Sequence, residues 1–140
     1  MQNSHSAPTG AYSQTTKQIT VSVEPIFLDE ESNPAANQYF WAYHVVIQNN
    51  GNDTVQLLSR YWRITNAQGM LHEVRGDGVV GEQPRLGPGE AFEYTSGTPL
   101  STSSGIMGGT YQMISGNGDS FDIDIPTFSL DSPYEGHAVH

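Results

Sequence analysis

The chain has 140 residues, no cysteine and a formal net charge of −10, from fifteen acidic and five basic side chains. This length fits one domain that buries about two-thirds of its unfolded surface, and the lack of cysteine excludes disulfides and thiolate metal sites and favours a cytoplasmic location. The acidic balance argues against nucleic acid as a partner, and no run of about 18 apolar residues exists to cross a membrane.

The order of polar and apolar residues divides the chain into three parts. Residues 1–16 are polar and rich in Ser, Thr, Gln and Gly, so we expect a disordered N-terminal arm. The folded domain is expected at 17–130, followed by a flexible tail at 131–140. Within the domain, 18–28 alternates apolar and polar residues, and 38–48 is β-branched and aromatic on both faces, the pattern of a central strand.

Further strands are predicted between turn signals that recur about every ten residues. The strands are expected at 54–65, 70–74, 90–94, 105–115 and 120–130, with turns rich in Asn, Gly and Asp between several of them. No apolar period of 3.6 residues persists along the chain. The pattern therefore predicts an all-β fold, an antiparallel β-sandwich of the immunoglobulin-like or fibronectin type III-like kind with about seven to eight strands; a closed barrel is the alternative.

A glycine motif lies between two of these predicted strands. Gly76, Gly78 and Gly81 have the G-x-G-x-x-G spacing of loops that hold a pyrophosphate. A dinucleotide fold needs a helix directly after the glycines, yet Glu82, Gln83 and Pro84 follow and oppose both a helix and a phosphate. We therefore favour glycines that permit tight backbone geometry between strands, with a phosphate-binding loop as the alternative.

The basic residues are concentrated in one segment. Four of the five fall in 60–85, accompanied by only three acids. One interpretation is that these arginines pair with the acids and cover the sheet with their apolar stems; the other is a site for a small anion or an acidic peptide. The residues concerned are Arg60, Arg63, Arg75 and Arg85, with Glu73, Asp77 and Glu82.

Catalytic and metal-binding patterns are weak in this sequence. His44 and His72 lie on predicted strands, and no Ser occupies a G-x-S-x-G elbow, so no nucleophilic triad is indicated. Asp122 and Asp124 point to one face of a strand, but two carboxylates do not make a cation site. We predict no catalytic residue, no metal site, no cofactor and no enzymatic activity.

Several motifs in fixed order resemble the bacterial ApaG family over about 17–130. The resemblance implies a fibronectin type III-like or immunoglobulin-like sandwich, binding rather than catalysis, and an association with cobalt and magnesium efflux in a protein that is not itself a transporter. The motifs are Ser59-Arg-Tyr-Trp-Arg-Ile-Thr65, Val74-Arg-Gly-Asp-Gly-Val-Val-Gly-Glu-Gln-Pro84, Leu86-x-Pro-Gly-Glu90, Phe92-x-Tyr-x-Ser96, Gly109-x-Tyr-Gln-Met113 and Phe121-x-Ile-x-Ile-Pro-x-Phe-x-Leu130.

Two functional hypotheses follow. The first is a non-enzymatic interaction module, a monomer or weak dimer, that presents a rigid surface to an unknown protein partner. Because neighbours on a strand face opposite ways, one of Tyr61 and Trp62 is expected in the core. The alternative is a binder of a small anion or nucleotide, such as pyrophosphate or a dinucleoside polyphosphate, held by amides of 76–81 with Arg63 and Arg75 as clamps. The predicted surface comprises Arg60, Trp62, Arg63, Arg75, Gly76, Gly78 and Gly81.

Overall fold

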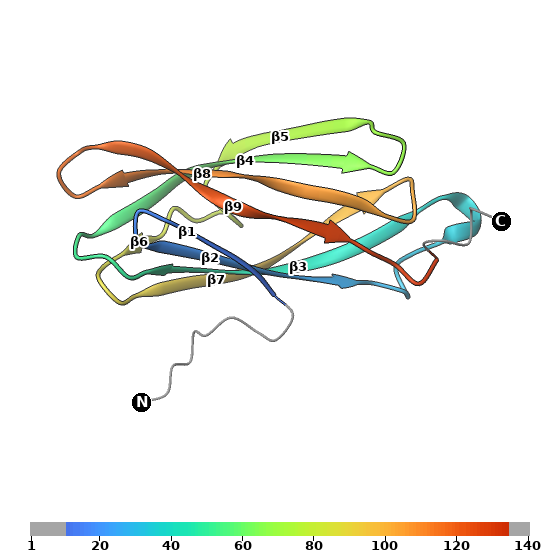
Figure 1. Ribbon diagram of the computed structural model, residues 1–140, viewed down its shortest axis with the longest axis horizontal. Coiled ribbons are helices and arrows are strands. Elements are labelled where there is room, and N and C mark those ends of the chain that lie inside the picture. Colours follow the sequence, from blue (N-terminus) through green and yellow to red (C-terminus); the bar gives the residue numbers. More distant parts are fainter. Residues whose placement is uncertain (1–10, 135–140) are drawn as a thin grey trace, which may run out of the picture.

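The computed structural model describes residues 11–134 and has two antiparallel sheets packed face to face (Figure 1). It confirms the predicted all-β sandwich, with nine strands in the described residues because two short strands escaped the sequence patterns. The elements are β1 (Tyr12–Thr16), β2 (Ile19–Phe27), η1 (Pro34–Ala36), β3 (Tyr39–Asn49), β4 (Val55–Asn66), β5 (Leu71–Asp77), β6 (Arg85–Leu86), β7 (Ala91–Leu100), β8 (Gly105–Ser115) and β9 (Ser120–Leu130).

One sheet has the strand order β1-β2-β3-β7 and the other the order β5-β4-β8-β9, with β6 pairing to β4 beyond the end of β5. The alternating residues of the predicted central strand β3 explain its position, because Trp41, Tyr43, Val45 and Ile47 all face inward and are buried. The single helical element among residues 11–134 is the short turn η1, so the described chain has no helix with the length and apolarity to cross a bilayer.

Aromatic side chains from both sheets fill the centre of the sandwich. Trp62 of β4 is 2% exposed, and its ring lies 5.3 Å from Tyr43, 6.3 Å from Tyr111 and 6.2 Å from Phe128 between centroids. The contacts are largely edge-on, the arrangement that aromatic quadrupoles favour. This cluster joins the sheets, since Tyr43 belongs to β3 and the other rings belong to β4, β8 and β9.

A β-bulge in β4 decides which of its side chains enter this core. Val55 and Leu57 face inward, but the register with β8 shifts between Leu57 and Ser59. The extra residue reverses the alternation, so that Trp62 and Ile64 face the core in place of their neighbours.

The N-terminal boundary differs from the prediction. Tyr12–Thr16 were expected to belong to a disordered arm, yet they form β1, which pairs with β2 along five positions. The polar sequence was misleading because β1 is an edge strand whose middle three residues are exposed, and pairing needs only its backbone. Lys17 and Gln18, both with positive φ, make the turn into β2. The rest of the predicted arm, 1–10, lies outside the described residues.

The start of the predicted tail is also packed against the domain. The indole Nε1 of Trp41 donates a hydrogen bond to the carbonyl oxygen of Asp131 at 2.7 Å, and the ring of Tyr134 lies 6.1 Å from those of Phe27 and Tyr39. The prediction of a tail from Asp131 was therefore wrong for 131–134, because these contacts extend the aromatic core. Residues 135–140 lie outside the described part of the chain.

Candidate functional site

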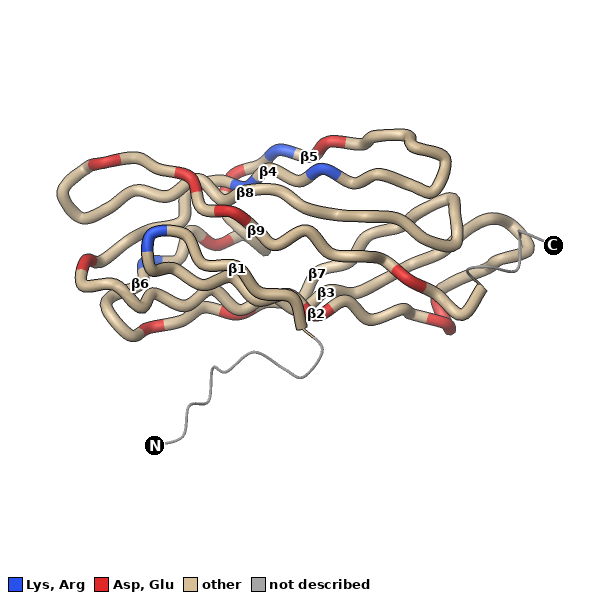
Figure 2. The backbone as a smooth tube through the Cα atoms, in the orientation of Figure 1, with Lys and Arg blue, Asp and Glu red and all other residues tan. Residues whose placement is uncertain are grey.

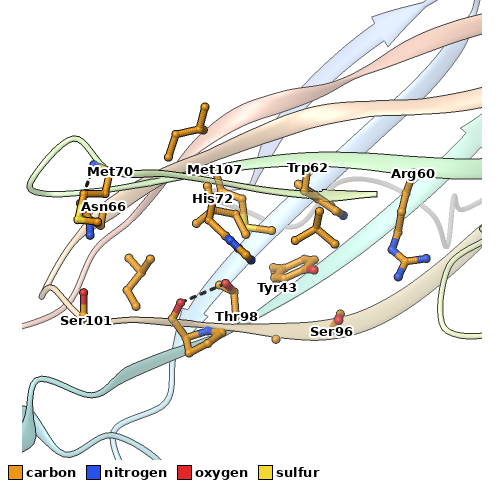
Figure 3. A pocket seen from close by; sticks show the side chains of 16 residues that line it. Tyr43, Arg60, Trp62, Asn66, Met70, His72, Ser96, Thr98, Ser101 and Met107 are labelled. Carbon is orange, nitrogen blue, oxygen red and sulfur yellow. Dashed lines mark hydrogen bonds between the residues drawn. The ribbon is translucent and has the colours of Figure 1, made fainter. Parts of the chain in front are cut away.

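A groove runs between the two sheets where β5 and β7 form their edges (Figure 3). Its volume is about 550 Å³, within the range of ligand sites in proteins. Trp62, Tyr43 and Met107 lie at its inner side, and His72 of β5 points across it toward Thr98 of β7 (Figure 3). The groove therefore borders the aromatic core and lies between two strands, each with only one partner strand among residues 11–134.

The lining is apolar with a few polar groups and no carboxylate among the described residues, although the chain has fifteen acids. Figure 3 shows Arg60 at one end, next to Tyr43 and Ser96, and Met70 with Asn66 at the other. Arg60 is the one lining residue with a permanent positive charge. A few polar groups placed in an apolar cleft is the usual composition of a binding site.

Arg60 joins the groove to the glycine segment. Its Nη1 donates hydrogen bonds to the carbonyl oxygens of Asp77 and Gly78, both at 2.9 Å. Gly76 lies opposite Arg60 on β5, and a Cβ added there would lie 2.9 Å from the guanidinium carbon. Glycine at this position therefore makes room for the guanidinium. The Nε and Nη2 groups of Arg60 have no hydrogen-bond partner within residues 11–134.

Three tyrosines interact electrostatically with Arg60, and one of them, Tyr43, lines the groove. The hydroxyls of Tyr94 and Tyr111 are 2.5 Å apart and connect β7 to β8 across the sandwich. Burial raises the pKa of Tyr94, Tyr111 and Tyr43, and the positive charge of Arg60 opposes the increase at all three. The tyrosines are therefore protonated at neutral pH and supply neutral hydroxyls beside the guanidinium.

Trp62 was predicted to belong to the binding surface, but its side chain is not exposed on the outer face of the sheet. Trp62 is buried, whereas its neighbour Tyr61 is partly exposed on the outer face. The expectation that one of the two lies in the core is met by Trp62, because the bulge after Leu57 turns it inward. Trp62 thus contributes to the groove from its inner side and offers no indole on the outer surface.

The arginines of the positive segment do not all share one surface, although Arg60 and Arg75 both line a shallow pocket with Gly76, Asp77 and Asp122. Arg63 and Arg75 lie on the outer face, where their guanidinium carbons are 5.7 and 4.2 Å from the centroid of the Tyr61 ring. Arg60 points inward, and Arg85 lies on β6 beside Gln56. Figure 2 shows the basic positions spread over β4, β5 and β6. A strand places alternate residues on opposite faces, so nearness in sequence did not give nearness in space.

The predicted pairing of these arginines with Glu73, Asp77 and Glu82 is also absent from residues 11–134. Glu73 instead accepts a hydrogen bond from the Tyr61 hydroxyl, which raises the pKa of that tyrosine. Arg63 and Arg75 stack on the Tyr61 ring in a cation–π arrangement. The outer face therefore has two arginines that contact the Tyr61 ring, and no pocket lies between them in residues 11–134.

The glycine segment forms the end of a hairpin. Gly76 belongs to β5 rather than to a loop, and Gly78 has φ +64° with its amide donating to the Leu58 carbonyl at 2.8 Å. The amides of Val79 and Glu82 donate to each other's carbonyl groups at 2.8 and 2.9 Å. Two of the amides of the predicted anion nest, those of Gly78 and Val79, are therefore engaged in internal hydrogen bonds. Val80 and Gly81, both at positive φ, complete the turn.

The other titratable residues singled out in the sequence, His44, Asp122 and Asp124, do not line the groove. His44 lies on the four-stranded sheet, where its Nδ1 is 2.8 Å from the Thr95 hydroxyl and its Nε2 is 3.0 Å from Glu93. Asp122 and Asp124 are exposed on β9, and no group of three His, Cys, Asp or Glu residues suited to a metal occurs within 11–134.

Sequence reasoning missed the β7 side of the groove, which includes Ser96 and Thr98. One signal was available, since Pro99 lies inside β7 and proline within a sheet marks an edge strand. His72 was considered only as a catalytic candidate and set aside. Its exposed position over the groove depends on the pairing of β5 with β4, which sequence patterns do not give.

The fold and groove define a class of small two-sheet β-sandwich proteins with an open edge. A family profile described as the ApaG domain matches residues 29–115. Proteins named ApaG from Parvibaculum lavamentivorans and Paramagnetospirillum magneticum are 57% and 61% identical to this chain; the matches cover 92% and 89% of it, and 99% and 95% of those proteins. The chain therefore belongs to the ApaG family.

A solved structure supports the same assignment. The crystal structure of a putative ApaA protein from Bordetella pertussis superimposes with a TM-score of 0.80 at 50% sequence identity. The match covers 82% of this chain and 94% of that one. The two-sheet sandwich is thus shared with a relative of high sequence similarity.

Proposed function

We propose that this ApaG protein is a non-enzymatic binding module whose partner protein occupies the groove between β5 and β7. The observation that carries the proposal is an apolar cleft of about 550 Å³ bordered by two strand edges that have no further strand partner in the described chain. Unpaired edges offer backbone hydrogen bonds to an added segment, and an apolar cleft offers side-chain burial.

The alternative, a small-anion or nucleotide site at 76–81, has weaker support. The amides of Gly78 and Val79 are engaged within the hairpin, and Arg63 and Arg75 stack on Tyr61. A titration with pyrophosphate, ATP and diadenosine tetraphosphate, followed by amide chemical shifts, separates the two functions. Shifts confined to 76–81 would support the anion site, and silence there at millimolar ligand would reject it.

The association with cobalt and magnesium efflux that the family resemblance implies is an indirect effect under this proposal. The described residues provide no cluster of metal ligands, and a binding module influences ion transport through the protein that it contacts. We propose no catalytic step and no resident cofactor for this chain.

Site-specific photocrosslinking in the native cell tests the proposed function. A benzophenone amino acid placed at His72 is exposed at the groove, and one placed at Ile106, which is 53% exposed on β8, is the matched control away from it. We expect a defined adduct from position 72 and none from position 106. Equal labelling from both positions would contradict the groove as the binding surface.

A further inference from the structure

Arg60 gives the groove a charge preference at one defined point. Both N–H groups of Nη1 donate hydrogen bonds to the carbonyl oxygens of Asp77 and Gly78. The N–H groups of Nε and Nη2 have no hydrogen-bond partner within residues 11–134. The groove lining includes no carboxylate; Asp77 and Asp122 line a second, shallow pocket that Arg60 also borders, but neither forms an ion pair with it within residues 11–134. An arginine with free donors in a partly apolar cleft attracts a carboxylate more strongly than an exposed arginine does.

The surroundings of the guanidinium suit a bound carboxylate. The neutral hydroxyls of Tyr43 and Ser96 lie next to it at the same end of the groove (Figure 3). Neutral hydroxyls add donors without adding negative charge. The net charge of −10 repels anions from most of the protein. The guanidinium of Arg60 therefore makes this end of the groove the position that favours a carboxylate.

The spacing to the apolar part of the groove is fixed by the strand. Arg60 and Trp62 are two residues apart on the inward face of β4, which separates their Cα atoms by about 7 Å. An extended peptide has the same repeat, because its alternate side chains also point to one side. A large apolar residue over Trp62 and Met107 therefore places the side chain two positions away beside Arg60.

We propose that the groove binds an extended segment of a partner protein in which an aspartate or glutamate lies two residues from a large apolar side chain. The apolar side chain enters the groove near Trp62 and Met107, the carboxylate pairs with Arg60, and the peptide backbone adds to a free strand edge of β5 or β7. This inference rests on the proposed function and specifies the chemistry of its partner.

Selection from a random heptapeptide library displayed on phage, with the full chain as bait, tests this specificity. We expect enrichment of peptides with an acid two positions from Leu, Ile, Met or an aromatic residue. The Arg60→Gln variant should lose the preference for the acid and keep the preference for the apolar residue. Arg63→Gln is the matched control, since it removes the same charge from the outer face of the same strand and should leave both preferences intact.

A change in the peptide avoids dependence on how well the Arg60 variant folds. The most enriched peptide and its Glu→Gln or Asp→Asn counterpart are titrated into the unmodified protein by calorimetry. We expect about tenfold weaker binding without the carboxylate. Amide chemical shifts should change at Ser96, Thr98, His72 and Val74 and remain constant at the control position Ile106.

The outcomes separate the inference from the proposed function. The inference would be overturned if the selected peptides shift the groove amides but show no preference for an acid. It would also be overturned if a peptide and its Gln or Asn counterpart bind with the same affinity. Either result would leave the binding module in place. If no selected peptide shifts the groove amides, both proposals fail.

Discussion

The two long sides of the sandwich end differently. On one side β1 and β9 meet, with the Asp124 amide donating to the Thr16 hydroxyl at 3.1 Å and the rings of Tyr12 and Phe128 at 6.0 Å. On the other side, the corresponding edge strands β5 and β7 leave a groove that reaches the core at Trp62. One core therefore has a closed and an open boundary.

This difference shows that a side of the sandwich is closed by a short, polar edge strand, β1, and not by the apolar core. The middle three residues of β1 are exposed, yet the strand covers the side of β2 and contacts β9. No equivalent strand follows β5 or β7 in the described chain. The open side is thus one added strand short of the closed side, and a bound segment can supply that strand.

The largest expected effect concerns the core that both sides share. Replacing Trp62 with alanine removes a ring that is 2% exposed and should lower the free energy of unfolding by about 3–5 kcal/mol. Tyr61→Ala, one residue away on the outer face, is the matched control and should cost about 1 kcal/mol or less. Urea denaturation measures both. Similar losses at the two positions would contradict the assignment of Trp62 to the core at the groove.

Opening the closed side is the next largest change. A chain that begins at Gln18 lacks β1, which exposes one face of Phe128 and removes the hydrogen bonds to β9, so the free energy of unfolding should fall by about 2 kcal/mol. Denaturation by urea measures the loss, and amide spectra should show the groove residues unchanged. If stability is retained in full, β1 does not close the sandwich.

The tyrosine pair behind the open side predicts a loss of stability in alkali. Burial raises the pKa of Tyr94 and Tyr111, so the folded protein keeps both protons while the unfolded chain loses them near pH 10. Stability is therefore complete below that pH and declines as the pH rises above it.

Above pH 10 the free energy of unfolding should fall less steeply with pH in the Tyr94→Phe variant, by about 1.4 kcal/mol per pH unit. The reason is that the variant releases one proton fewer when it unfolds. Chemical denaturation at pH 9, 10 and 11 measures the slope. The other five tyrosines and the single lysine also titrate in this range, so the difference between the variant and the unmodified protein is the quantity that isolates Tyr94. Identical slopes for the two proteins would show that the Tyr94 hydroxyl is not the group responsible.

The smallest expected effect is a gain at the hairpin end near Arg60. Val80 is 56% exposed with φ +42°, an unfavourable conformation for a β-branched residue. Val80→Asn creates the Asn-Gly pair that such turns prefer and should raise the free energy of unfolding by about 0.5–1 kcal/mol, seen as a higher Tm. Ile106→Asn, on a regular strand, should give no gain, and equal gains would refute the role of φ.

The sequence predicted the strands well where alternation is regular. The run 38–48 forms β3, and the runs 105–115 and 120–130 form β8 and β9. These segments were predictable because their apolar residues follow the period of two that a strand requires. It could not predict β1, since an edge strand held by backbone hydrogen bonds needs no apolar pattern.

The candidate site was predictable only in part. Arg60 was identified within a basic segment, but its separation from Arg63 depends on which face of the sheet each side chain takes. The bulge at Leu57 and Ser59 sets that choice for β4, and an inserted residue leaves no signal in composition. The groove also needs β5 and β7 on the same side of the sandwich, a property of strand order rather than of either segment.

The turn at Lys17 has a practical consequence for experiments on this protein. Lys17 is the only lysine in the sequence, and it lies between β1 and β2 on the closed side, away from the β5 and β7 edges. Apart from the α-amino group, amine-reactive dyes and coupling resins can therefore attach at one position. The protein can be tethered or labelled there with the groove oriented toward solution, so immobilisation and binding do not compete for the same surface.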